Sequence, residues 1–126
     1  MKALIIGLGS IGQRHLQNIV NIYGNKVEIH SYREKSGKFE IKEGVKTKKK
    51  IQEKYNIKEH NNLTNAIKAK PNFVLICNPS AFHEKFINIA IKNNLNFFVE
   101  KPAVILTKNI VKIAKNINKK KLITMV

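Results

Sequence analysis

The chain has 126 residues, 43% of them apolar, and carries a formal net charge of +16 at pH 7. This size suits one domain with a buried core, and the single cysteine, Cys77, excludes an intrachain disulfide. The apolar part of the N-terminal "MKALIIGLGSIG" is too short for a signal-peptide core or a membrane span, so we expect a cytoplasmic protein with no membrane contact and no metal site.

The positive charge is nearly all lysine, because Arg14 and Arg33 are the only arginines. Its two densest runs, Lys48 to Lys50 and Lys119 to Lys121, lack the interleaved aromatic residues with which single-strand binders stack bases. These runs are typical of solvated faces, so nucleic acid is not an expected partner and stays a distant alternative. A basic surface would still help to gather ligands that carry phosphate.

In chain order, strand-length apolar runs alternate with segments of helical period, which predicts βαβ units and a mostly parallel sheet. A first strand over Lys2 to Gly7 precedes a helix that ends at Gly24-Asn25. A second strand, Lys26 to Tyr32, alternates polar and apolar residues, which is unusual for a central parallel strand. We then expect a long mobile loop over Arg33 to Lys46, a short helix over Lys46 to Tyr55 and a weak strand within Asn56 to Asn62.

In the second half, a short helix over Leu63 to Ala69 precedes the clearest strand, Phe73 to Cys77. Ser80 and Thr107 are candidate N-caps for the next two helices, and each of these helices leads into a further strand. These two strands cover residues 96–100 and 122–126. The predicted fold class is α/β, a doubly wound, mostly parallel sheet (Rossmann fold), as a single domain over residues 1–126 with the second catalytic domain absent.

Gly7, Gly9 and Gly12 form a G-x-G-x-x-G motif between the first strand and the first helix. The first glycine permits a tight turn, the second lets a pyrophosphate approach the backbone, and the third lets helix and strand pack closely. The helix start at Ser10 and Ile11 offers free N–H groups and a positive dipole end to the phosphates. We therefore predict that these five residues bind a dinucleotide.

The end of the second strand lacks the acidic residue that usually accepts hydrogen bonds from the adenosine ribose. Tyr32 and Arg33 occupy this place, and Arg33 could pair with a 2′-phosphate, so the cofactor is NAD(P) with NADP preferred. In the alternative, Arg33 is a surface residue and Glu34 or the Ser31 hydroxyl meets the ribose.

Together with the glycine motif, "NPSAFH" after the fourth strand and "EKP" after the fifth resemble the N-terminal domain of the Gfo/Idh/MocA oxidoreductases. That resemblance implies that Asn78, Pro79 and His83 lie beside the nicotinamide and its ribose. It also implies that Glu100 bonds a ribose hydroxyl and that Lys101 is the catalytic residue at the reacting oxygen. Without the resemblance, His83 is more simply a residue at a helix start that bonds the backbone.

The resemblance implies hydride transfer between NAD(P) and a hydroxyl or carbonyl carbon of a sugar, nucleotide sugar or cyclitol. Full-length members continue into a second domain that supplies most of the substrate pocket and usually the oligomer interface, so we expect 126 residues alone to be inactive and a full-length form to be a homo-oligomer. The alternative is a stand-alone nucleotide-binding module without turnover, which senses a nucleotide or assists a partner.

Overall fold

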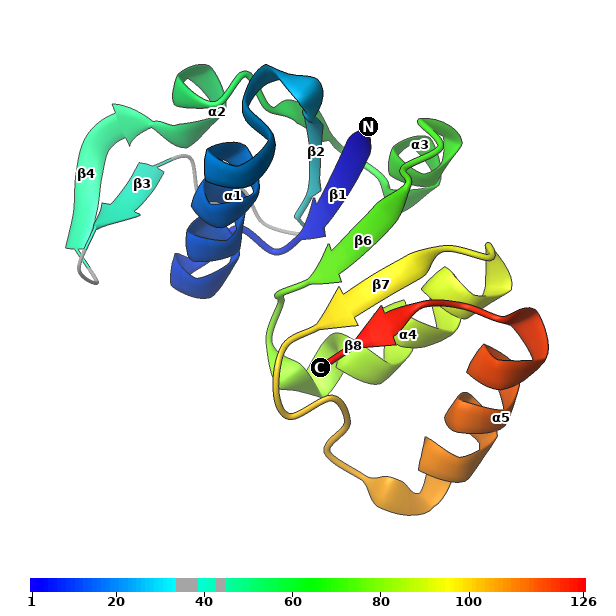
Figure 1. The fold of residues 1–126 in the computed structure, drawn as a ribbon. Helices are drawn as coiled ribbons and strands as arrows, with labels where there is room; N and C mark the ends of the chain where they lie inside the picture. Colours follow the sequence, from blue (N-terminus) through cyan, green and yellow to red (C-terminus); the bar gives the residue numbers. More distant parts are fainter. Residues whose placement is uncertain (34–38, 43–44) are drawn as a thin grey trace.

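A computed structural model describes residues 1–33, 39–42 and 45–126, with the side chains of residues 34–49 left out. Its main sheet has six strands in the order β5-β2-β1-β6-β7-β8, all parallel (Figure 1). The parallel α/β fold that we predicted is confirmed. The strands are β1 (Lys2–Ile6), β2 (Glu28–Tyr32), β5 (Lys58–His60), β6 (Phe73–Ile76), β7 (Asn96–Val99) and β8 (Thr124–Met125).

The chain order reverses at the centre of this sheet, between β1 and β6. From β1 the chain builds outward through β2 to β5, and it then returns to β6 and builds outward the other way through β7 to β8. In such a sheet the crevice at the carboxyl ends of the two central strands is where ligands bind. The helices are α1 (Ser10–Tyr23), α2 (Ile51–Lys54), α3 (Leu63–Lys68), α4 (His83–Lys92) and α5 (Ile110–Lys120), with 3₁₀ turns at Gly24–Lys26, Ser80–Phe82 and Thr107–Asn109.

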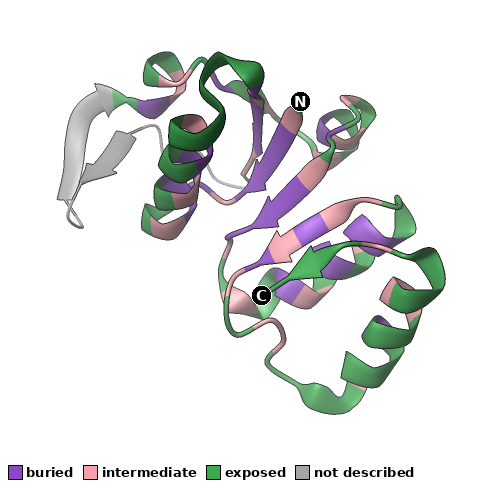
Figure 2. Ribbon diagram, viewed as in Figure 1, coloured by how far each residue is buried: buried purple, intermediate pink, exposed green. Residues whose placement is uncertain are grey.

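Two apolar clusters hold the helices to opposite faces of the sheet. One face packs Ala3 and Ile5 against Leu16 of α1, and the other packs Leu4 and Ile76 against residues of α3, α4 and α5. The central strands β1 and β6 are buried along nearly their whole length (Figure 2). Burying one such Leu or Ile side chain stabilises the fold by roughly 1.5–3 kcal/mol, so these strands form a rigid base for the loops that follow them.

The polar residues of strand β2 bond to one another and to residues of β5, from the buried His30 to Glu28 and Lys58 at the surface. Nε2 of the buried His30 donates to Glu28 Oε1 over 2.8 Å, and its Nδ1 lies 2.7 Å from Nε2 of His60 on β5. Nζ of Lys58 reaches Glu28 Oε1 at 2.7 Å. The bonds from Lys58 and His30 lower the pKa of Glu28 from 4.5 to about 2. The alternating pattern of this strand therefore reflects a polar network that runs from a buried histidine to the surface.

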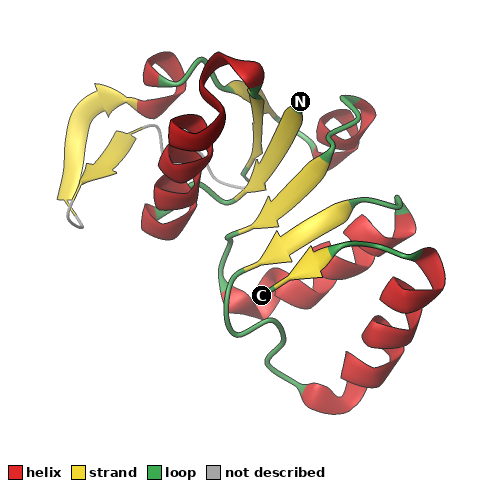
Figure 3. Cartoon of the chain, in the orientation of Figure 1, coloured by secondary structure: helices red, strands yellow, loops and turns green. Residues whose placement is uncertain are grey.

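The region after β2 differs from our prediction (Figure 3). The helix predicted over Lys46 to Tyr55 is wrong in its first half, because β4 (Val45–Lys50) pairs antiparallel with β3 (Phe39–Lys42) and only Ile51–Lys54 is helical. Lysines three and four residues apart repel in a helix, and strand pairing avoids that arrangement. The hairpin also replaces part of the loop predicted over Arg33 to Lys46, of which residues 34–38 and 43–44 lie outside the described residues.

The two predicted serine and threonine caps are wrong. Ser80 and Thr107 each begin a 3₁₀ turn that precedes the helix, so Phe82 and Asn109 occupy the cap positions of α4 and α5, with no side-chain cap bond. The helix ends are better predicted, since Gly24 stops α1 with a φ of +54°. In the described part of the chain, no helix is long and apolar enough to cross a membrane.

Candidate functional site at the carboxyl edge of the sheet

The three sequence motifs follow three neighbouring strands that end at the same level. Ile6 of β1 is in register with Ile76 of β6, and Ile76 is in register with Val99 of β7. The ladder of hydrogen bonds continues one residue further, from Cys77 N to Ile6 O at 2.8 Å and from Glu100 N to Ile76 O at 2.9 Å. Adjacent strands lie about 4.8 Å apart, so the glycine loop and the Glu-Lys-Pro turn are separated by roughly two strand spacings along one edge.

Gly7 and Gly12 are glycines because the protein itself fills the space around them. Gly7 has a φ of +90°, and a Cβ there would lie 2.7 Å from the backbone N and Cα of Asn78. A Cβ on Gly12 would lie 2.1 Å from the carbonyl oxygen of Gly7. Both distances are far below ordinary contact, so any side chain would force the loop, helix α1 and the β6 loop apart. These two positions serve the close packing that the motif predicts.

Gly9 is different, because a Cβ there would meet no protein atom within 4 Å. Its backbone is extended, with φ −69° and ψ −171°, a conformation that any residue adopts. The fold therefore does not require glycine at this position. Gly9 is the N-cap of the 14-residue helix α1, with Ser10 exposed and Ile11 half-buried in the first turn. An open approach to backbone N–H groups at a helix start suits a bound diphosphate.

The loop after β6 holds Asn78 and Pro79 and leads to His83 at the start of α4. Asn78 is half-buried, and its side-chain Oδ1 is buried without a hydrogen-bond partner. The exposed Pro79 is next to it. A buried amide oxygen without a partner is costly, so the site has an acceptor available for a ligand donor at this point.

His83 links two of the loops at this edge. Its ring is 1% exposed, with Nδ1 2.8 Å from the carbonyl oxygen of Pro102 and Nε2 2.7 Å from that of Asn78. Both ring nitrogens thus lie within hydrogen-bond distance of backbone carbonyls, and the one that carries the proton donates, which is the simpler role that the sequence suggests for this residue. The contact with a cofactor that the family resemblance implies for His83 stays a prediction.

The Glu-Lys-Pro turn follows β7 directly, and its Lys101–Pro102 peptide bond is cis. The Glu100 carboxylate accepts from Nε2 of His15 over 2.6 Å and from the backbone N–H of Lys101 over 3.2 Å. The bond from His15 makes the largest contribution to lowering the pKa of Glu100 below its usual 4.5. Lys101 itself is exposed at the rim.

The end of β2 brings Tyr32 and Arg33 to the same edge, since Gly7 N donates to Tyr32 O over 3.1 Å. The Arg33 side chain is 7% exposed, and its Nε lies 3.5 Å from Oε1 of Glu59. Burial lowers the pKa of Arg33, and the charge of Glu59 opposes that change. Nε and Nη2 of Arg33 and Oγ of Ser31 are buried without hydrogen-bond partners. Glu34, the alternative ribose contact, lies outside the described residues.

These features together fit a dinucleotide lying across the edge. Gly9 follows β1, and β1 lies in the sheet between β6, which leads to Asn78, and β2, which carries Ser31 and leads to Arg33. Both neighbours therefore bring buried polar atoms without hydrogen-bond partners. The nicotinamide and adenosine parts of a dinucleotide extend to opposite sides of its diphosphate, so such a ligand could offer hydrogen-bonding groups to both sets.

The sequence did not point to His15 as a residue of the site. It lies in the second turn of α1, next to the buried Leu16. The spacing of apolar residues along this helix indicates only that His15 is not one of the core residues. The signal that could have found it is its place three residues after Gly12, which puts it on the side of the helix near the strand ends. Its ring lies 4.8 Å from that of Phe98 on β7, in addition to its contact with Glu100.

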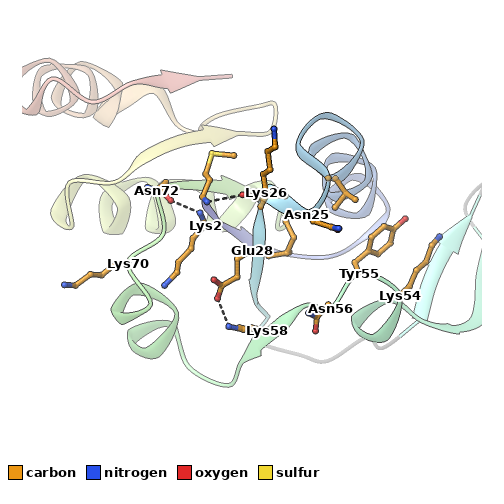
Figure 4. Close-up of a pocket in the computed structure, with 15 residues that line it drawn as sticks. Lys2, Asn25, Lys26, Glu28, Lys54, Tyr55, Asn56, Lys58, Lys70 and Asn72 are labelled. Atoms are coloured by element: carbon orange, nitrogen blue, oxygen red, sulfur yellow. Dashed lines mark hydrogen bonds and ion pairs between the residues drawn. The ribbon is translucent and has the colours of Figure 1, made fainter.

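A separate hollow of about 860 Å³ lies at the opposite edge, at the amino ends of β1, β2 and β5. Its lining includes the N-terminus, five lysines and Glu28. Figure 4 shows Lys2, Lys26 and Lys70 pointing in different directions, while Lys58 is bonded to Glu28. Because these charges do not converge, this hollow is not a formed site for one small anion, and it contains none of the predicted site residues.

Solved structures with the same fold include dehydrogenases, and their chains are about three times as long as this one. The chain is similar to myo-inositol 2-dehydrogenase from Lactobacillus plantarum, with 23% identity and a TM-score of 0.77 over 99% of this chain and 35% of that one. It is also similar to the WlbA dehydrogenase from Chromobacterium violaceum in complex with NADH and UDP-GlcNAcA, with 16% identity and a TM-score of 0.75 over 100% and 34% of the two chains. A third similar structure is GenD2 from gentamicin A biosynthesis in complex with NAD, with 20% identity and a TM-score of 0.77 over 99% and 33% of the two chains.

The chain spans about a third of the length of each of these proteins. No curated protein matches it in sequence. The model of the Gfo/Idh/MocA family, described as an oxidoreductase family with an NAD-binding Rossmann fold, matches residues 1–126. The chain therefore belongs to the Gfo/Idh/MocA oxidoreductase family, through its NAD-binding Rossmann fold.

Proposed function

We propose that residues 1–126 form one dinucleotide-binding domain that holds NAD(P) across the carboxyl edge of the sheet. The observation that carries this proposal is the open space at Gly9, at the start of α1 and after the central strand β1. The neighbouring glycines are fixed by internal contacts, so the lack of a side chain at Gly9 serves a ligand and not the fold.

All the predicted residues have a role in this proposal except His83, whose ring nitrogens lie against backbone carbonyls. Backbone N–H groups of Gly9, Ser10 and Ile11 bind the diphosphate, while Gly7 and Gly12 hold the loop against the β6 loop. Asn78 and Pro79 meet the nicotinamide and its ribose, and Glu100 accepts from a ribose hydroxyl. At the adenosine end, Tyr32 and Arg33 meet the ribose or its phosphate.

The bound nicotinamide would supply the hydride chemistry, and Lys101 would supply a positive charge at the reacting oxygen of the substrate. Lys101 is exposed and lies one residue beyond Glu100, so its ammonium is free to approach a substrate at the nicotinamide end of the edge. Charge that develops on that oxygen is stabilised by a cation held nearby. The substrate class that we propose is a sugar, nucleotide sugar or cyclitol, supported by the myo-inositol and UDP-GlcNAcA in the names of similar structures.

The choice between NAD and NADP depends on Arg33. Its Nε and Nη2 have no hydrogen-bond partner, although Nε is in an ion pair with Glu59, and they could bond a 2′-phosphate, which supports our preference for NADP. Glu59 works against this preference, because a carboxylate 3.5 Å from the guanidinium both competes for it and repels a phosphate. We keep NADP as the proposed cofactor and make the comparison of the two dinucleotides part of the test.

The test is a fluorescence titration of the chain with NADH and with NADPH at two salt concentrations. We expect saturable binding of at least one dinucleotide, with only moderate weakening by salt. A lack of saturation at millimolar dinucleotide would overturn the proposal. Binding that falls steeply with salt and is matched by any polyanion would instead support an unspecific basic surface.

A second candidate function is a nucleotide-binding module without turnover, favoured by the fact that Lys101 alone among the predicted site residues would act on a substrate. The two candidates differ in an assay of the product of the whole gene with NAD(P) and a panel of sugars and cyclitols. Reduction of the cofactor with one of these substrates supports the oxidoreductase, and binding with no turnover across the panel supports the module. The same preparation gives the oligomeric state, and we propose a homo-oligomer. The proposed location is the cytoplasm.

A further inference from the structure

His15 joins helix α1 to the Glu-Lys-Pro turn across 85 positions of sequence. Its Nε2 lies 2.6 Å from Oε1 of Glu100, and the two side chains are 22% and 18% exposed. Because a carboxylate has no proton to give, the ring nitrogen is the donor of this bond. A short bond between partly desolvated groups is stronger than one on an open surface.

The bonds to Glu100 fix both of its carboxylate oxygens. His15 holds Oε1, and the backbone N–H of Lys101 holds Oε2 at 3.2 Å. Each oxygen keeps one lone pair for a further donor. The ring contact of His15 with Phe98, at 4.8 Å between centroids, holds the imidazole against the strand that carries Glu100.

We propose that His15 is a positioning residue that holds the Glu100 carboxylate ionised and oriented to accept a hydrogen bond from the cofactor ribose. This inference rests on the proposed function, because it concerns the same edge of the sheet. The ionisable groups that act on Glu100 agree with it. His15 and Lys101 favour the carboxylate, and the thiol of Cys77, on the neighbouring strand, has its pKa raised to about 12 and stays neutral.

The proposal also explains how the two ends of the site are coupled. His15 is on α1, whose first turn would bind the diphosphate in the proposed function, and Glu100 follows β7 at the proposed nicotinamide end of the edge. A shift of α1 would therefore move the donor away from the carboxylate. Losing this bond should weaken cofactor binding although His15 does not itself touch the cofactor.

Three variants separate positioning from simple packing. His15→Phe keeps a ring against Phe98 and removes the donor, His15→Gln restores a donor at nearly the place of Nε2, and Glu100→Gln removes the charge of the acceptor. In NADH titrations we expect the dissociation constant to rise about tenfold for His15→Phe and by less than about threefold for His15→Gln. In the Glu100→Gln background, His15→Phe should add less than about twofold.

An unchanged dissociation constant for His15→Phe would overturn the proposal. A full tenfold effect in the Glu100→Gln background would also overturn it, because His15 would then act without Glu100. Equal losses for His15→Phe and His15→Gln, accompanied by a large drop in melting temperature, would mean a purely structural role and would also count against it.

A second measurement needs no cofactor and so separates this inference from the proposed function. The carboxyl carbon of Glu100 can be followed by NMR as the pH is lowered. We expect its titration midpoint to lie below the ordinary value in the wild-type chain and to move upward in His15→Phe. If the wild-type chain binds neither dinucleotide, the proposed function is refuted. If the titration midpoint of Glu100 is the same in His15→Phe as in the wild-type chain, the contact between His15 and Glu100 is refuted.

Discussion

The glycine loop allows a sharp test, because the same substitution should cost little stability at Gly9 and much more at Gly12. We choose valine at both positions, which adds the same three carbons. At Gly9 the first added carbon meets nothing within 4 Å, and the extended backbone suits valine. The expected cost to the fold is about 1 kcal/mol, from replacing glycine at a helix N-cap by a poor capping residue.

At Gly12 the first carbon alone would lie 2.1 Å from the carbonyl oxygen of Gly7. Relief needs a backbone shift of about an ångström between the helix and the loop. Overpacking of this kind costs about 1–3 kcal/mol for small additions, and three carbons against backbone should cost at least about 3 kcal/mol. For a chain of this size 1 kcal/mol is worth roughly 4 °C in melting temperature. We therefore expect losses of about 4 °C for Gly9→Val and more than about 12 °C for Gly12→Val.

For cofactor binding the informative variant is Gly9→Val, because the protein should stay folded. Valine at Gly9 blocks the approach of the diphosphate to the helix start, at the loss of one or two hydrogen bonds to a charged group worth about 1.5–3 kcal/mol each. The dissociation constant for NADH or NADPH should then rise at least about tenfold while the protein stays folded. Calorimetry and fluorescence titration on the same samples give both quantities. A folded Gly9→Val protein with unchanged affinity would refute the diphosphate site.

Further predictions concern single groups. Lys101→Ala in a full-length enzyme should leave the cofactor dissociation constant within about threefold and lower kcat by about 10²–10³, measured by steady-state kinetics, and an undiminished kcat would place the polarising group elsewhere. Glu59→Gln should tighten NADPH relative to NADH by about threefold in parallel titrations, because it removes the charge that competes for Arg33; equal ratios would count against an Arg33–phosphate contact. Since the folded pKa of Glu28 is about 2 and its ordinary value is 4.5, the stability that it contributes is complete above pH 4.5 and lost between about pH 4.5 and 2, so Glu28→Gln should flatten acid unfolding in that window. Cys77 is buried with a pKa near 12, so a thiol reagent should modify it at pH 8 only after denaturant is added, and rapid labelling of the native chain would contradict its burial.

Local patterns predicted much of the fold correctly. The apolar runs of β1 and β6 and the glycine that ends α1 are properties of a few adjacent residues, and they appear in the structure close to where we predicted them. The same local patterns failed over residues 45–50, where a helical period was outweighed by pairing with β3. Strand pairing is a contact between segments, and no local count of apolar residues measures it.

The sequence by itself determined that the glycine turn and the motifs "NPSAFH" and "EKP" each follow a strand. The apolar run that forms a strand is local, so its carboxyl end can be located from the adjacent residues. The tertiary structure alone decided which strands are neighbours and at what register. That placement brings Asn78 against Gly7, Glu59 beside Arg33 and His15 onto Glu100. These contacts join residues from 26 to 85 positions apart. They depend on the packing of helices against a twisted sheet, and the energy of that packing is distributed over the whole core.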